Sequence, residues 1–166
     1  MSLELPLASS EQTEKLGASL ARCAPRSSAA AVIVYLQGEL GAGKTTLARG
    51  LLRALGVSGV VRSPSYTLLE AYESAGLRLF HLDLYRLAGA ADLAMVGWRD
   101  ELTPGALLLI EWPERAAGAL PPADLTVALS ILGEGRHARL TAASAAGAAW
   151  LDALRSDAAV AEMNRV

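Results

Sequence analysis

The sequence has a single cysteine, Cys23, among its 166 residues. One cysteine excludes an intramolecular disulfide and a zinc site built from several cysteines. Long apolar runs are also missing, because the longest, Ala29 to Leu36, has eight residues and is too short to cross a bilayer as a helix. The first residues, MSLELPLASSEQTEK, show no basic segment followed by an apolar stretch. We therefore expect no signal peptide, no membrane association and a cytoplasmic location.

An excess of positive charge is missing as well. The chain has 15 Lys+Arg against 17 Asp+Glu, which gives a net charge of −2 at pH 7. Proteins that hold nucleic acid through a broad surface of their own carry a clear basic excess. We expect no DNA binding, and no tight binding of tRNA by this chain alone.

Hydrophobic patterning predicts an α/β fold in which residues 1–166 form one domain, with a mixed, mainly parallel sheet flanked by helices. Continuous apolar runs at 30–37 and 106–112 predict strands covered on both faces, as in the centre of a parallel sheet. Further strands are expected over 66–73, 77–84, 124–132 and 136–142. Helices are expected over 9–23, 44–55 and 145–160, with weakly helical pieces within 89–102.

A glycine-rich segment follows the first apolar strand. It reads Gly38-Glu39-Leu40-Gly41-Ala42-Gly43-Lys44-Thr45, which has the pattern G-x-x-x-x-G-K-T. In such a loop, glycines let successive backbone N–H groups point at phosphate oxygens, and the start of the next helix adds partial positive charge. Lys44 is expected to reach the β- and γ-phosphates, Thr45 to bind Mg²⁺ through its hydroxyl, and Thr46 to donate toward the α-phosphate. The segment predicts nucleotide binding in a P-loop NTPase-like fold.

The use of lysine in the chain supports this interpretation. Lysine occurs only at Lys15 and Lys44, whereas arginine occurs thirteen times. A compact ammonium fits between phosphates in a way that a planar guanidinium does not. Lys44 is therefore placed where the chemistry of lysine itself is needed.

Acidic side chains stand at the ends of two expected strands. Asp83 closes the segment LRLFHLD, and Glu111 follows four apolar residues in LLLIEW. Ligands bind at the carboxyl ends of strands in open α/β sheets, and a bound nucleotide needs acidic partners for Mg²⁺ and for the attacking water. We expect Asp83 and Glu111 to converge on Mg²⁺ beside Thr45.

Several neighbouring positions leave alternatives open. His81 fits a hydrogen-bonded structural histidine better than a catalyst. Arg86 contacts a phosphate or pairs with an acid, and Trp112 covers the site or packs in the core, the second being favoured for Trp112. Residues 62–67 (RSPSYT) fit a segment that becomes ordered around a γ-phosphate, or a turn before a strand. His137 has no ligand-type neighbours, so no histidine metal site is expected.

Five segments, in order, resemble the TsaE family of small bacterial ATPases, also called the YjeE or YdiB family. They are GELGAGKTTLARGLLRALG, VRSPSYTLLEAY, FHLDLYRL, LIEWPER and GRHARL. The resemblance implies a P-loop fold and ATP hydrolysis that is weak in isolation. It implies a role in the threonylcarbamoyl modification of the adenosine beside the anticodon in ANN-decoding tRNAs. It also implies coupling to the TsaB–TsaD complex, in the turnover of the threonylcarbamoyl transferase, with tRNA contacted only through that complex.

The same resemblance assigns roles to particular residues. The range 38–46 falls on the phosphate loop, with Thr45, Asp83 and Glu111 on the Mg²⁺ and hydrolysis positions. Arg136 falls on an arginine that lies toward the nucleoside, and the region of Thr13 borders the base.

The chain departs from the family pattern at two positions. Residues 63–67 fall on a switch-like segment of the family, in which Ser65 replaces the usual threonine and keeps its hydroxyl. Glu39 replaces the usual aspartate and is expected to point outward, with little effect.

Other functional classes fit the residues less well. A small-molecule kinase has the same loop but normally carries an arginine-bearing lid over the phosphates, and no compact Arg-rich insertion is evident. A GTP-operated switch needs an Asn/Thr-Lys-x-Asp segment, which lysines at 15 and 44 and the sole asparagine at 164 exclude. An inactive structural relic is disfavoured by the intact Lys44-Thr45 pair and the two acids.

Overall fold

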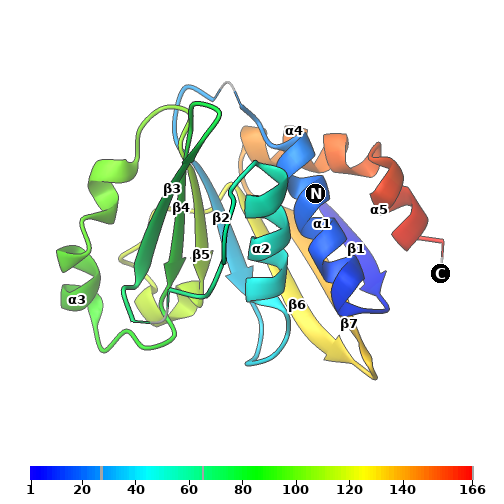
Figure 1. The fold of residues 1–166 in the computed structure, drawn as a ribbon, viewed down its shortest axis with the longest axis horizontal. Helices are drawn as coiled ribbons and strands as arrows, with labels where there is room; N and C mark the ends of the chain where they lie inside the picture. Colours follow the sequence, from blue (N-terminus) through cyan, green and yellow to red (C-terminus); the bar gives the residue numbers. More distant parts are fainter. Residues whose placement is uncertain (27, 65, 166) are drawn as a thin grey trace.

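A seven-stranded sheet runs through the molecule in the order β1-β7-β6-β2-β5-β4-β3 (Figure 1). The structure is a computed structural model that describes residues 1–26, 28–64 and 66–165. The strands are β1 Ser2–Leu7, β2 Val32–Gln37, β3 Leu69–Ser74, β4 Leu77–Asp83, β5 Leu107–Glu111, β6 Leu125–Leu132 and β7 Gly135–Ala142. All except β3 and β7 point in one direction. The prediction of a mixed, mainly parallel sheet is confirmed.

Helical segments cover both faces of this sheet. They are α1 Ser10–Cys23, α2 Lys44–Ala54, α3 Ala90–Met95, α4 Ala145–Arg155 and α5 Ala158–Met163, with 3-10 turns η1 Trp98–Glu101 and η2 Pro113–Ala116. One core cluster joins the sheet to α1, α2, α4 and α5, and a second joins it to α3, η1 and η2. Within the described ranges, no helix has the length and apolar character needed to cross a bilayer.

The central strands send alternate side chains into the two clusters. In β5, Leu107 and Leu109 belong to the first cluster, while Leu108 and Ile110 belong to the second. This is why the sequence of β5 is apolar throughout, since a strand with helices on both faces has no side exposed to water. The expectation that 30–37 and 106–112 are doubly covered strands is confirmed.

Helices α1 and α2 approach closely because glycines stand where they meet. A Cβ atom on Gly50 would lie 2.1 Å from the carbonyl oxygen of Glu14, and one on Gly17 would lie 2.2 Å from that of Leu47. The two backbones are therefore in direct contact, which only glycine permits. This contact holds the first turn of α1 beside the loop that precedes α2.

The N-terminal residues form an edge strand that the sequence reasoning did not identify. Strand β1 pairs antiparallel with β7, so that Leu5 lies opposite Ala138. Leu5 and Leu7 are buried, and their alternation with polar residues was the signal for a half-buried strand. The expected strand 66–73 also begins later, at Leu69.

The helix expected over 145–160 is two helices, which corrects that prediction. Helix α4 ends at Arg155, and Asp157 is the N-cap residue of α5. Its side chain accepts hydrogen bonds from the backbone N–H groups of Ala159 and Val160. Its carboxylate also accepts hydrogen bonds from Ser19 and Arg22 of α1, at 2.9 Å in each case. Burial raises the pKa of Asp157, but these hydrogen bonds and the charge of Arg22 outweigh it and hold the pKa below its ordinary value.

Candidate nucleotide site

The glycine-rich segment connects β2 to α2, as its pattern predicts. Strand β2 ends at Gln37 and α2 begins at Lys44, with Gly43 as the N-cap residue. Gly43 has a φ of 106°, in the left-handed region that favours glycine, and a Cβ there would lie 3.3 Å from the Thr13 methyl carbon. The N-terminal N–H groups of α2 and its helix dipole are therefore available to an anion held in the loop. Glu39 is exposed, as expected.

The ammonium of Lys44 lies inside the loop. Its Nζ donates to the carbonyl oxygens of Gly38 and Glu39 at 2.6 and 2.9 Å, and it lies 4.0 Å from the centre of the Trp112 ring. Burial lowers the pKa of Lys44 from its ordinary value, and the negative charge of Glu111 opposes this shift. Both hydrogen bonds go to the loop itself, so a triphosphate in the loop would offer this cation stronger, charged acceptors.

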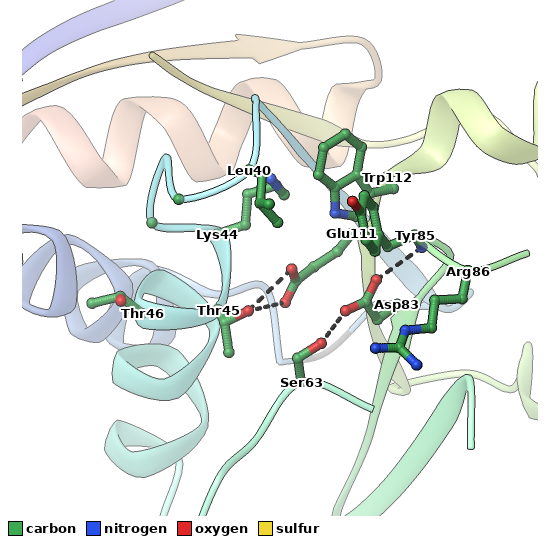
Figure 2. Close-up of a pocket in the computed structure, with 12 residues that line it drawn as sticks. Leu40, Lys44, Thr45, Thr46, Ser63, Asp83, Tyr85, Arg86, Glu111 and Trp112 are labelled. Atoms are coloured by element: carbon green, nitrogen blue, oxygen red, sulfur yellow. Dashed lines mark hydrogen bonds between the residues drawn. The ribbon is translucent and has the colours of Figure 1, made fainter. Parts of the chain in front are cut away.

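Asp83 and Glu111 end adjacent parallel strands and are paired in register. Their side chains are almost fully buried, at 4% and 2% exposure. The hydroxyl of Thr45 donates to the two carboxylate oxygens of Glu111 at 3.1 and 3.2 Å. On the other side, the Ser63 hydroxyl and the Tyr85 backbone N–H donate to Asp83 (Figure 2). The structure therefore brings together the two acids and the threonine that the sequence reasoning selected.

A pocket of about 390 Å³ contains these groups. It is lined by Leu40, Gly41, Gly43, Lys44, Thr45, Thr46, Ser63, Asp83, Tyr85, Arg86, Glu111 and Trp112. In Figure 2, Thr45 points toward Glu111 and Ser63 points toward Asp83, with the Trp112 ring above the two acids. A cation, backbone donors and carboxylates in one cavity suit a phosphate chain accompanied by a metal ion.

A second pocket, of about 180 Å³, lies on the other side of the same loop. It shares Gly41, Gly43 and Thr46 with the first pocket and is also lined by Ser9, Ser10, Thr13, Glu134, Gly135 and Arg136. The Arg136 guanidinium donates to the carbonyl oxygen of Gly41 at 3.0 Å. Thr13 and Arg136, which the family resemblance places near the nucleoside, thus lie together beside the phosphate loop.

The donors in the first pocket fit Mg²⁺ as an ion that arrives with a nucleotide. Thr45, Asp83 and Glu111 offer hydroxyl and carboxylate oxygens, which are the ligands that Mg²⁺ prefers. Among the described residues, no group of three or more His, Cys, Asp or Glu side chains is placed to hold a metal. These three side chains would fill only part of an octahedral shell, and phosphate oxygens and water are the usual remaining ligands of Mg²⁺.

Arg86 and Trp112, whose roles the sequence left open, both line the first pocket. Arg86 pairs with no acid among the described residues, and its guanidinium lies 4.5 Å from the centre of the Tyr66 ring. A contact between Arg86 and a phosphate stays a prediction. Trp112 was expected in the core, but it is half-buried, with one side packed on the second core cluster and its ring over Lys44. It therefore lines the site as well as packing. Trp112 stands between the end of β5 and the start of η2 and has a left-handed φ of 57°.

The described residues of the hydroxyl-rich segment 62–67 form the turn that was one of the two interpretations, while ordering of the segment around a γ-phosphate stays a prediction. Ser63 enters the pocket and bonds Asp83. The Leu68 N–H donates to the carbonyl of Pro64 at 2.8 Å, which makes a turn before β3. Ser65 lies outside the described residues.

Sequence reasoning missed several residues that line the pockets. Tyr85 follows Asp83 by two positions, and its ring lies 4.9 Å from that of Trp112. Glu134 and Gly135 reach the second pocket from the β6–β7 turn. The only signal for Tyr85 was its closeness to a strand-end acid, and nothing local marked the turn residues.

Comparisons with known proteins identify the family of the chain. The sequence model of the family described as "Threonylcarbamoyl adenosine biosynthesis protein TsaE" matches residues 7–139. The tRNA threonylcarbamoyladenosine biosynthesis protein TsaE of Haemophilus influenzae is 47% identical over 112 residues, which cover 68% of this chain and 71% of that protein. The protein of the same name from Aquifex aeolicus is 35% identical over 136 residues, covering 81% and 91%.

A solved structure shows the same fold. The crystal structure of Bacillus subtilis YdiB superposes with a TM-score of 0.76 over 94% of this chain and 95% of that one, at 24% identity. With a family match over residues 7–139 and relatives of this similarity, the chain belongs to the TsaE family of tRNA threonylcarbamoyladenosine biosynthesis proteins.

Proposed function

We propose that this chain binds ATP with Mg²⁺ in the first pocket and hydrolyses it slowly, as its contribution to threonylcarbamoyladenosine formation in tRNA. One observation carries the proposal. The phosphate loop, with Lys44 and Thr45, meets the paired strand-end acids Asp83 and Glu111 in a single pocket of about 390 Å³. These are the groups that phosphoryl transfer to water requires.

Each group has a role that its position allows. The loop N–H groups and the ammonium of Lys44 hold the β- and γ-phosphates. Thr45, Asp83 and Glu111 hold Mg²⁺, which when bound neutralises charge on the phosphate oxygens. Glu111 is buried beside the Thr45 hydroxyl, and its anionic carboxylate acts there as a ligand or as the base that orients the attacking water.

The second pocket takes the nucleoside. Thr13 and Arg136 lie on the far side of the loop from the acids, within reach of a ribose and base that continue from the α-phosphate. The chain has no segment of the kind that reads guanine, so we expect ATP to bind more tightly than GTP.

Hydrolysis by the chain alone is expected to be slow, on the order of one turnover per minute or below, as for P-loop hydrolases that await a partner. Arg86 lines the first pocket, but its guanidinium stacks on the ring of Tyr66. We propose that the TsaB–TsaD complex completes the site and that tRNA is contacted through that complex. A net charge of −2 agrees with this indirect contact.

Release of phosphate from ATP, measured with the chain alone and then with purified TsaB and TsaD, tests the proposal. We expect slow release alone, faster release with the two partners, and loss of both in Lys44→Ala. Lys15→Ala is the matched control, because Lys15 is the other lysine and pairs on the surface with Glu11 at 2.9 Å. Equal turnover by Lys44→Ala and Lys15→Ala contradicts the phosphate-loop role. Turnover only after addition of a small-molecule acceptor favours the kinase alternative.

A further inference from the structure

A fully buried histidine lies directly behind the acidic pair. His81 is 0% exposed, and its Nε2 lies 2.8 Å from Oε1 of Glu111. Its place on β4, two residues before Asp83, puts it on the same face of the sheet as that acid. The ring reaches across to the neighbouring strand β5 and meets Glu111 from the side of the core.

The environment of the ring fixes its hydrogen-bonding role. An ionised carboxylate only accepts hydrogen bonds, so the contact with Glu111 needs a proton on Nε2. Among the described residues Nδ1 has no partner, and an N–H there would be a buried donor without an acceptor. The arrangement therefore favours the imidazole with its proton on Nε2 and a bare Nδ1.

Among the described residues, the Glu111 carboxylate has side-chain donors in His81 and the Thr45 hydroxyl, so loss of His81 would leave the hydroxyl. That hydroxyl stands in the first turn of α2, next to the phosphate loop, and under the proposed function it would bind Mg²⁺ when a nucleotide is present. His81 comes from the sheet, which holds its place whether or not a nucleotide is present. It is therefore the donor that fixes the carboxylate independently of the ligand.

We propose that His81 is a positioning residue, which holds the Glu111 carboxylate toward Thr45 and the metal side of the pocket through an Nε2–H donor. Its effect on turnover rests on the proposed ATPase function. Residues that orient metal ligands typically change activity by about 10- to 100-fold when they are removed. The fold needs no histidine at this depth, since Leu79 and Leu109 beside it are apolar and equally buried.

Three variants separate positioning from packing. His81→Leu removes the donor, and we expect kcat for ATP to fall by about 10-fold or more while KM changes by about threefold or less. His81→Gln offers an amide N–H in place of Nε2–H, and we expect it to restore most of kcat. His137→Leu is the matched control, since His137 is a surface histidine 3.4 Å from Glu4, and it should behave as wild type. Wild-type turnover in His81→Leu, or no rescue by the Gln variant, overturns the proposal.

A second measurement does not depend on activity, and its first result comes from the wild-type protein alone. The chain has two histidines, so a long-range ¹H–¹⁵N spectrum of ¹⁵N-histidine-labelled wild-type protein resolves both rings. We expect a proton on Nε2 of His81, and a shift of its nitrogen signals in Glu111→Gln but not in Lys15→Ala. An Nε2 without a proton, or signals unchanged by Glu111→Gln, overturns the proposal. If the wild type hydrolyses no ATP even with TsaB and TsaD, the proposed function fails while this spectrum still decides the role of His81.

Discussion

Replacing Glu111 by glutamine tests the chemistry of the site with little change in its shape. The glutamine carbonyl can accept from His81 Nε2–H in place of Oε1, which now lies 2.8 Å from that nitrogen. Its amide can donate to the Thr45 hydroxyl in place of Oε2, which now lies 3.2 Å from that oxygen. Because both contacts survive, we expect the free energy of unfolding to change by about 1 kcal/mol or less. What is lost is the negative charge, since an amide is neither an anionic ligand nor a base.

The expected effect on turnover is large. Proton transfer by a positioned side chain contributes about 10²- to 10⁴-fold to a rate. This range corresponds to about 2.7 to 5.5 kcal/mol of lost transition-state stabilisation. Single-turnover phosphate release from ATP measures the rate, and calorimetric titration with a non-hydrolysable ATP analogue measures binding. We expect binding within a few-fold of wild type and a rate at least about 100-fold lower. A rate within twofold of wild type in a variant that binds normally would refute the assigned role of Glu111.

The remaining predictions concern packing, charge and the loop. Gly50→Ala places a Cβ 2.1 Å from a backbone oxygen of α1, so we expect it to lower the free energy of unfolding by about 1–3 kcal/mol in urea titrations. A Cβ on Gly89 meets nothing within 4 Å, so Gly89→Ala should lower the free energy of unfolding by less. Asp157→Asn keeps the helix cap but loses the pairing that lowers the pKa of Asp157. Near neutral pH we expect the wild type to have a free energy of unfolding about 0.5–1 kcal/mol above that of the variant, and this difference should vanish as the pH falls below about 4. A difference that persists at pH 2 would contradict this. Trp112 fluorescence should change when ADP draws Lys44 from beneath its ring, and Trp112→Phe should abolish that change; an unchanged emission at saturating ADP argues against the predicted movement of Lys44.

Local sequence patterns were sufficient for the parts of the fold that depend on local physics. Strands β2 and β5 are apolar throughout because helices cover both sheet faces, and that requirement is visible in the sequence of each strand alone. The glycine-rich loop is equally local, since its spacing and its place between a strand and a helix define it. The candidate acids followed from the rule that ligands bind at the carboxyl ends of strands.

Contacts between distant segments account for what the sequence did not show. Strand β1 is held by β7, and the break before α5 is held by Ser19 and Arg22 of α1, more than a hundred positions away. The position of Arg86 over Tyr66 depends on how the segment before β3 folds back, which no local pattern specifies. His81 was interpreted correctly as hydrogen-bonded, but its partner Glu111 became known only with the register of β4 and β5.

A crystal structure with a non-hydrolysable ATP analogue and Mn²⁺ in place of Mg²⁺ tests the central claim most directly. The anomalous signal of Mn²⁺ locates the metal without ambiguity. We expect one peak within coordination distance of Thr45 Oγ1 and beside Asp83 and Glu111, with the phosphates along the loop at 38–45 and the base toward Thr13 and Arg136. A metal peak elsewhere, or phosphates outside the loop, would contradict the account.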